Sequence, residues 1–234
     1  MDEAWSNAHA NFLSSLSQSE LAALTKSARK IVYTKRAQIF TAGDTSREIF
    51  IVLGGCIKLY QLSPGGKEII LWFCFPGEMF GVAETVRGSA REIFAEANVN
   101  STVLVLSQME FENFLCIHPQ AAMRAIGILS ARIRTLGHSL VDMAADDVET
   151  RLVRLLLRFG AGALPSPCQA ARSSPEICLN IEVTHNDLAN LIGTTRQTVT
   201  STLTRFRNQG LVKLLDRHIH ITDPEHLKQM LDAV

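Results

Sequence analysis

The spacing of apolar residues divides the chain into a β-rich first part and a helical second part. Between Ile31 and Ser107 the apolar residues form short runs, separated by turn residues such as Pro64-Gly65-Gly66. Runs at intervals of about ten residues with glycine-rich breaks are typical of an antiparallel sandwich or jelly roll. The predicted strands are 48–53, 57–62, 68–75, 94–99 and 102–106. A short helix is expected before them at 17–28, because Ser17 and Glu20 have the spacing of a capping box.

Beyond Pro119 the apolar spacing becomes helical, and one set of residues recurs at alternating intervals of three and four. The set is Ile126, Leu129, Ile133, Leu136, Leu140 and Met143. A mean repeat of about 3.5 residues is typical of the seam between two coiled helices. The pattern therefore predicts a dimerisation helix over 118–145. The alternative is a single helix that lies on its own β-domain.

The C-terminal part contains a pattern of two short helices followed by two β-runs. Thr184 and Asp187 have capping-box spacing, Gly193 can end a helix in the left-handed conformation, and Thr194 or Thr195 can cap the next helix. The runs 212–215 and 218–221, separated by Asp216-Arg217, predict a hairpin. The whole unit is a predicted winged helix-turn-helix. A further helix is expected at 149–159, and the stretch 160–175, rich in small residues and proline, is expected to be a loop.

The second short helix has polar side chains suited to DNA. Near its N-terminal end, where a recognition helix meets base edges, stand Arg196, Gln197, Thr200 and Ser201. Arginine can bind guanine through two hydrogen bonds, and glutamine can pair with adenine in the same way. Phosphate contacts, which fix register without reading sequence, are expected from Thr184, His185, Thr198 and Arg205. The alternative is a helix pair that serves only for packing.

Charge and length support this division. The chain of 234 residues is long enough for two modest domains, and its 23 basic and 23 acidic residues exclude a wholly basic nucleic-acid coat. The basic character is local, because 188–222 holds five basic residues and only Asp216 as an acid. We expect an effector-sensing β-roll at 1–117, the dimerisation helix at 118–145 and the DNA-binding domain at 146–234. With no apolar run near the ~20 residues of a membrane span and no signal-peptide pattern, the expected location is the cytoplasm.

Cysteine and histidine positions argue against metal and redox chemistry. The five cysteines form no C-x-x-C pair, so we expect reduced thiols and no metal site. A cupin-like β-roll enzyme needs a His/Glu ligand set inside the roll, yet no histidine lies between His9 and His118. The chain is therefore expected not to be an enzyme. A dimeric ligand-binding adaptor without affinity for DNA is the other rival.

The order of β-roll, long helix and winged helix-turn-helix resembles the Crp/Fnr family of bacterial transcription regulators. Residues 183–199 are similar to the family's helix-turn-helix signature, and 76–81 to the turn of its ligand domain. The resemblance implies an α+β fold with an antiparallel β jelly roll of the cyclic-nucleotide-binding type. It also implies a homodimer on a near-palindromic operator, with RNA polymerase as a partner. Members usually carry Glu where Gln197 stands and often Arg where Ser201 stands, so the half-site read here can differ from theirs.

The resemblance does not extend to the cyclic-AMP site. Members that bind cyclic AMP have Gly-Glu-Leu, followed about ten residues later by Arg-Ser. Here the triplet is Gly81-Val82-Ala83 and the pair is Arg91-Glu92. Because the Glu92 carboxylate would repel the nucleotide phosphate, we expect no tight binding of cyclic AMP.

A small carboxylate such as 2-oxoglutarate is the expected effector. Backbone amides of the turn and two arginines would hold such an anion, through Phe80, Gly81, Val82, Ala83, Arg91 and Arg132. Phe80-Gly81-Val82, Arg91 and 129–132 are similar to the corresponding elements of the cyanobacterial nitrogen-regulator branch, which senses 2-oxoglutarate. The alternative is that Arg91 and Arg132 pair with Glu84, Glu92 or Glu96 in an empty roll.

Two cofactors of the family are disfavoured by the sequence. The oxygen-sensing branch holds an iron–sulfur cluster with cysteines near the N-terminus, and none precedes Cys56 here, so no iron–sulfur cluster is expected. The carbon-monoxide branch binds haem with Cys and His at positions that correspond to Gly81 and Ala83, so that haem site is absent. The segment 55–60, with Cys56, Lys58 and Tyr60, is similar to one in the nitric-oxide-responsive haem branch, and haem stays open as an alternative.

Overall fold

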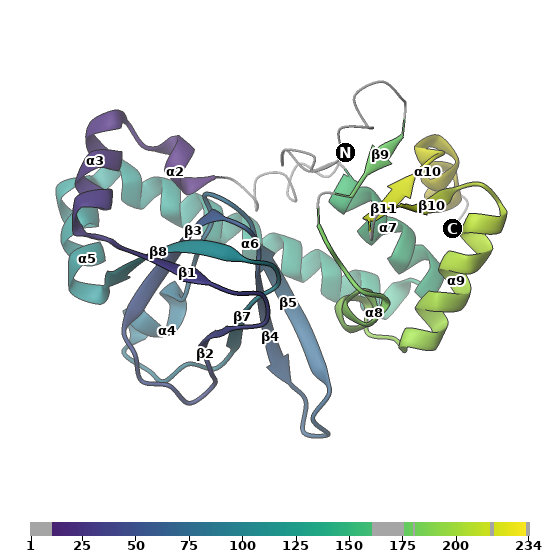
Figure 1. Cartoon of the computed structure of the whole chain (residues 1–234), viewed down its shortest axis with the longest axis horizontal. Helices are drawn as coiled ribbons and strands as arrows, with labels where there is room; N and C mark the ends of the chain where they lie inside the picture. The colour runs from purple at the N-terminus through teal and green to yellow at the C-terminus, as the bar shows by residue number, and fades with distance from the viewer. Residues whose placement is uncertain (1–10, 161–175, 180, 216–217, 233–234) are drawn as a thin grey trace. The chain divides into compact units, whose positions relative to one another are not determined.

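The computed structural model describes residues 11–160, 176–179, 181–215 and 218–232. These residues form two compact units, one that ends at Arg134 and one that begins at Thr135. The division falls inside the long helix α6 (Pro119–Ala145), which contributes to both units (Figure 1). Each unit is described by itself.

The N-terminal unit is an antiparallel roll of two four-stranded sheets, which confirms the predicted fold class. One sheet has the order β1-β8-β3-β6, formed by Arg29–Tyr33, Ser101–Ser107, Glu48–Gly54 and Met79–Phe80. The other has the order β2-β7-β4-β5, formed by Gln38–Phe40, Phe94–Ala97, Ile57–Leu62 and Glu68–Cys74. The helices of this unit are α2 (Phe12–Ser15), α3 (Gln18–Ser27), α4 (Val82–Arg87) and α5 (Gln108–Ile117).

The five predicted strands all exist within a few residues of their expected bounds, and the helix expected at 17–28 is α3, capped by Ser17 and Glu20 as predicted. Sequence reasoning missed β1, β2 and β6. Strands β2 and β6 have three and two residues, too few for an alternating pattern to stand out. Strand β1 begins with two basic residues and is mostly exposed, so it lacks an apolar face in sequence.

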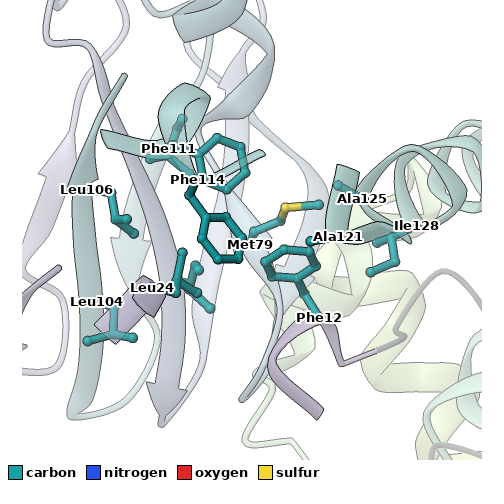
Figure 2. Packing of buried hydrophobic residues seen from close by; sticks show 12 residues of the cluster. Phe12, Leu24, Met79, Leu104, Leu106, Phe111, Phe114, Ala121, Ala125 and Ile128 are labelled. Carbon is teal, nitrogen blue, oxygen red and sulfur yellow. The ribbon is translucent and has the colours of Figure 1, made fainter. Parts of the chain in front are cut away.

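The core of this unit joins the roll to helices from both ends of the unit. Met79 of β6 is fully buried among Phe12 of α2, Phe111 of α5 and two residues of α6, Ala121 and Ile128. Figure 2 shows Phe12 and Ala121 close to the Met79 side chain. Helix α6 therefore does lie on its own roll, as the alternative prediction required, mainly through residues outside the apolar repeat and through one of its members, Leu129.

The C-terminal unit contains the predicted winged helix-turn-helix. It consists of α7 (Val148–Gly160), α8 (His185–Ile192), α9 (Arg196–Asn208), a sheet of order β10-β11-β9 (Val212–Leu215, His218–Ile221, Ile177–Cys178) and α10 (Pro224–Asp232). Both strands of the hairpin and the helix expected at 149–159 are confirmed. The expected loop after Gly160 and the turn Asp216-Arg217 lie outside the described residues. Strand β9 and helix α10 were not predicted.

Local sequence explains where the two helices of the motif begin and end. Thr184 and Asp187 form the predicted capping box at the start of α8, and Gly193 ends the helix with φ at 68°. Thr195, one of the two candidates, caps α9 by accepting from the Thr198 amide. In the part of the chain that the structure describes, no helix is long and apolar enough to cross a membrane.

Met79→Ala should destabilise the N-terminal unit by about 2–5 kcal/mol, because it leaves a cavity in a fully packed core. Guanidinium unfolding followed by tryptophan fluorescence measures the loss, since Trp72 lies in the same unit. Met109→Ala is the matched control, because Met109 is 69% exposed. Its stability should stay within about 0.5 kcal/mol of wild type. Equal losses in both variants would contradict the assignment of Met79 to the core.

Candidate functional site

The predicted base-reading residues share one exposed face of helix α9. Val199, Leu203 and Phe206 are buried and attach the helix to its unit. The exposed positions include all four predicted readers: Arg196, Gln197, Thr200 and Ser201. Their spacing of one, three and four residues places them side by side on a helix. The structure thus presents a polar surface along the first two turns of α9, a helix labelled in Figure 1.

Hydroxyl groups on this face are directed to the helix backbone. Thr200 donates to the carbonyl of Arg196 at 2.8 Å, and Ser201 donates to the carbonyl of Thr198 at 2.9 Å. Each hydroxyl has one proton, so these side chains present oxygen lone pairs to any outside partner. In this conformation Thr200 and Ser201 are acceptors, suited to the amino groups of adenine or cytosine.

The start of helix α8 adjoins this face through one hydrogen bond. His185 Nδ1 lies 2.9 Å from Thr200 Oγ1. Burial lowers the pKa of His185, and the positive charge of Arg196 lowers this pKa further. Thr184 is held by Asp187, because its amide and its hydroxyl both donate to that carboxylate, at 2.8 and 2.7 Å. Two of the predicted phosphate-binding residues are therefore placed beside the recognition helix.

The other two predicted phosphate contacts lie on the opposite flank of α9. Thr198 donates its amide to the N-cap hydroxyl of Thr195. Arg205 forms an ion pair with Glu149 in the first turn of α7. Sequence reasoning missed Glu149, because the two residues are 56 positions apart and no local pattern connects them. The pair places a carboxylate at the edge of the candidate DNA interface.

The apolar repeat of α6 is largely uncovered by the described part of the chain. Ile133 and Leu140 are 70% and 69% exposed, and Ile126, Leu136 and Met143 are exposed as well. Leu129 is partly buried and packs against the roll core. Large aliphatic side chains in a continuous exposed row are typical of an interaction surface.

The turn at Gly81, where the sequence predicts an effector, is held by a hydrogen bond from Arg91. Gly81, with φ at 74°, offers its carbonyl to Arg91 Nη1 at 2.7 Å and to the Thr85 hydroxyl at 2.7 Å. A Cβ at Gly81 would lie 3.0 Å from Arg91 Nη1, closer than ordinary van der Waals contact, and the positive φ also favours glycine here. Arg91 also pairs with Glu84 at 3.6 Å, and its side chain has no exposed surface. Burial lowers the pKa of Arg91 while Glu84 opposes that shift.

Aromatic rings surround the same guanidinium. The Arg91 guanidinium carbon lies 4.4 Å from the ring centre of Phe40 and 5.8 Å from that of Phe50. Phe80 stacks on Phe50 with ring centres 5.0 Å apart. Of the other predicted effector residues, Val82 is partly buried and Ala83 is exposed.

Arg132 reaches the same turn from helix α6. Its Nη1 donates to the carbonyl of Met79 at 2.7 Å, and its Nη2 pairs with the buried Glu78 at 2.6 Å. Trp72 Nε1 donates to the same Glu78 carboxylate at 3.1 Å. The structure therefore brings Arg91 and Arg132 to one turn, as predicted. Each arginine already has a carboxylate partner, Glu84 being one of those proposed and Glu78 one that sequence reasoning missed.

The segment considered for haem is engaged within the roll. Cys56 is buried, and Lys58 pairs with Glu68 at 3.1 Å and with Glu96 at 3.4 Å. Tyr60 stacks on Phe94 with ring centres 5.1 Å apart. Burial raises the pKa of Cys74 to about 12, which leaves that thiol protonated. Across the described ranges, no group of three His, Cys, Asp or Glu side chains is arranged to hold a metal ion.

Each of the two units matches the model of a known protein family. The cyclic nucleotide-binding domain model matches residues 30–118, and the Crp-like helix-turn-helix domain model matches 150–230. A regulator with a cyclic-nucleotide-binding-like roll and a Crp-like DNA-binding motif is thus the class that the two models define. The chain belongs to the Crp/Fnr family of transcriptional regulators, as the sequence resemblance indicated.

Relatives in that family are distant but cover nearly the whole chain. The CRP-like cAMP-activated global transcriptional regulator of Mycobacterium tuberculosis is 23% identical over 94% of this chain and 96% of its own length. The global nitrogen regulator of Synechocystis is 28% identical over 84% of this chain and 86% of its own length. Both names are those of regulators rather than enzymes.

Solved structures show the same fold. FixK2 from Bradyrhizobium japonicum matches 86% of this chain and 96% of its own with a TM-score of 0.74 at 20% identity. A CooA variant from Carboxydothermus hydrogenoformans matches 95% of this chain and 96% of its own with a TM-score of 0.76 at 22% identity.

Isothermal titration calorimetry should detect no tight binding of cyclic AMP. A nucleotide phosphate would need Arg91, whose side chain is enclosed and paired with Glu84, and Val82 has no polar group for the ribose. Breaking a buried ion pair costs about 3–5 kcal/mol, which would remove most of the gain from a phosphate contact. Micromolar affinity for cyclic AMP would contradict this prediction.

Proposed function

We propose that this protein is a homodimeric transcriptional regulator that binds a near-palindromic operator through helix α9 and responds to a small carboxylate. The observation that carries the proposal is the exposed polar face of α9. The ends of this helix are set by its N-cap residue Thr195 and its C-cap residue Gln209. Because such a regulator acts on the chromosome, the proposal includes a cytoplasmic location and RNA polymerase as a partner. The test is recovery of discrete genomic fragments by the purified chain, with mobility shifts at two salt concentrations.

The proposed dimer rests on the uncovered apolar repeat of α6. A second copy of the same helix would bury this row by coiled-coil packing and would remove its side chains from water. Two-fold symmetry would then present two copies of α9 to one face of a duplex. Both can enter successive major grooves only when they lie about 34 Å apart. An effector that changes the packing at Leu136, Leu140 and Met143 would change this spacing and hence affinity for DNA.

Ile133→Glu should dissociate the dimer, because it places a charge in the centre of the apolar seam. Sedimentation velocity should show monomers at micromolar concentration, with specific DNA binding lost in parallel. His138→Glu is the matched control, since His138 is exposed on the same helix but lies outside the repeat. A wild-type chain that sediments as a monomer at every concentration would refute the dimer.

Arg196→Ala should cost about 1–3 kcal/mol of binding free energy and relax preference at one base pair, as expected for loss of a base contact. Arg205→Ala should instead weaken binding to all sequences alike, as expected for a phosphate contact. Fluorescence anisotropy with the selected duplex and with a random duplex distinguishes the two. Equal losses on both duplexes for Arg196→Ala would contradict its proposed role.

Glu149→Gln tests the role of Arg205 in the opposite direction from Arg205→Ala. It removes the carboxylate that holds Arg205 in the free protein and leaves the side-chain shape nearly unchanged. Exposed ion pairs are worth about 0–1 kcal/mol, so binding to both duplexes should strengthen by at most about fivefold. A gain restricted to the selected duplex would indicate that Arg205 reads a base instead.

The proposed effector is a small carboxylate such as 2-oxoglutarate. Support comes from the convergence of Arg91 and Arg132 on the turn 78–81, where an incoming carboxylate could replace Glu84 or Glu78 without leaving a guanidinium unpaired. Relatives that match the chain include the global nitrogen regulators of cyanobacteria. An effector that competes with internal carboxylates should bind weakly, because part of its binding energy offsets the ion pair that it replaces.

Titration with 2-oxoglutarate, followed by NMR of arginine side chains labelled with nitrogen-15, tests this site. Shifts should appear at Arg91 and Arg132 and saturate at millimolar ligand. Succinate and a neutral diester of 2-oxoglutarate serve as controls for chain length and for charge. Absence of any shift at both arginines would reject the carboxylate proposal while leaving the DNA-binding proposal intact.

A further inference from the structure

We propose that His185 binds a DNA phosphate only in its protonated form, and that Thr200 is the positioning residue that holds the imidazole for this contact. The inference rests on the proposed DNA-binding function and adds a dependence on pH to it. In this view Thr200, expected from the sequence to read a base, instead acts through its neighbour on α8.

The hydrogen bonds of Thr200 determine which imidazole nitrogen carries the proton. The Thr200 hydroxyl donates its single proton to the carbonyl of Arg196 at 2.8 Å. With that proton engaged, we infer that its oxygen accepts from His185 Nδ1, 2.9 Å away. Neutral His185 is thus held as the Nδ1–H tautomer, and Nε2 carries a lone pair.

The state of Nε2 determines what the histidine can bind. Within the described residues, the hydrogen bond to Thr200 is the one recorded for this ring, so Nε2 is the nitrogen left for an outside partner. In the neutral ring Nε2 is an acceptor, and it repels the oxygen of a phosphate. After protonation both nitrogens donate, so Nε2–H can bind phosphate while Nδ1–H keeps its bond to Thr200.

Charges around the ring favour the neutral form in the free protein. Partial burial is the main cause of the lowered pKa of His185, and the positive charge of Arg196, on the facing helix α9, lowers this pKa further. On α8 itself, the nearby carboxylate of Asp187 is buried and accepts two hydrogen bonds, from the amide and the hydroxyl of Thr184. A DNA phosphate would supply the negative charge that this surrounding lacks. Binding of DNA should therefore raise the pKa of His185.

The proposal predicts the direction in which the affinity for DNA changes with pH. The His185 pKa is lowered in the free protein and raised in the complex, so binding takes up a proton between the two values. Affinity for DNA should increase as pH falls, by up to about tenfold per pH unit for one proton. The same lowered pKa means that protonation destabilises the free protein as pH falls below about 6.5. Circular dichroism at the lowest pH should confirm that the chain stays folded.

The experiment measures dissociation constants of the full chain at about pH 6 and about pH 8. The probes are a duplex selected by the protein from a random library and one unselected duplex. Wild type should bind both more tightly at the lower pH, because a phosphate contact is independent of sequence. His185→Gln should bind like wild type at the higher pH and lose the gain at the lower one. His185→Arg should bind tightly at both values, because its charge is permanent.

Matched variants distinguish this contact from other histidines and from a base-reading Thr200. His226→Gln removes an exposed histidine of α10 in the same unit and should keep the pH dependence of wild type. Thr200→Val should reduce the pH dependence, and Thr200→Ser should restore it by returning the hydroxyl. If Thr200→Val instead changes sequence preference and leaves the pH dependence intact, the positioning role is refuted.

Nitrogen-15 NMR of the histidine ring in the free protein supplies a readout that needs no DNA. The expected result is the Nδ1–H tautomer in wild type and in Thr200→Ser, with a mixture of tautomers in Thr200→Val. An Nε2–H tautomer in wild type would overturn the proposal. Binding to DNA without pH dependence would overturn this inference alone. Absence of DNA binding at every pH would overturn the proposed function and the inference with it.

Discussion

Helix α6 has apolar residues on two faces, and the residues that the structure describes cover only one of them. Small side chains such as Ala121 and Ala125 let the helix approach its own roll closely, while Ile133 and Leu140 remain in water. Exposed aliphatic surface of this extent is unfavourable, at about 25 cal/mol for each Å². A second copy of the same helix is the simplest cover, and the proposed arrangement of two recognition helices depends on it.

In the turn at 76–81, charged side chains inside the roll bind backbone carbonyl groups. Arg91 and Arg132 donate to the carbonyls of Gly81 and Met79, and they pair with the carboxylates of Glu84 and Glu78. Charges with so little exposure are tolerated only when they are paired and hydrogen-bonded. The same requirement applies to the proposed carboxylate effector, because a ligand that binds either arginine would also have to replace its carboxylate.

Side chains of the neighbouring helices bind polar side chains on both flanks of α9 and so limit the contacts that these can make with DNA. Glu149 holds Arg205 on one side, and His185 shares a hydrogen bond with Thr200 on the other. Judged by exposure alone, all of these side chains would be candidate DNA contacts. Their hydrogen bonds instead divide the α9 side chains into groups that can donate and groups that can only accept, and the proposed role of the neighbouring His185 ring on α8 depends on its proton.

Much of this protein follows from the sequence by itself. Strand runs, the capping residues Ser17 and Thr184, the left-handed Gly193 and the hairpin are encoded by local pattern, and each is found where that pattern predicted it. Strands β2 and β6 escaped prediction because two or three residues carry no period. The carboxylates Glu78 and Glu149 escaped because their partners lie 54 and 56 residues away. Local sequence determines which element forms, whereas the partner of each charge is decided only when distant segments fold together.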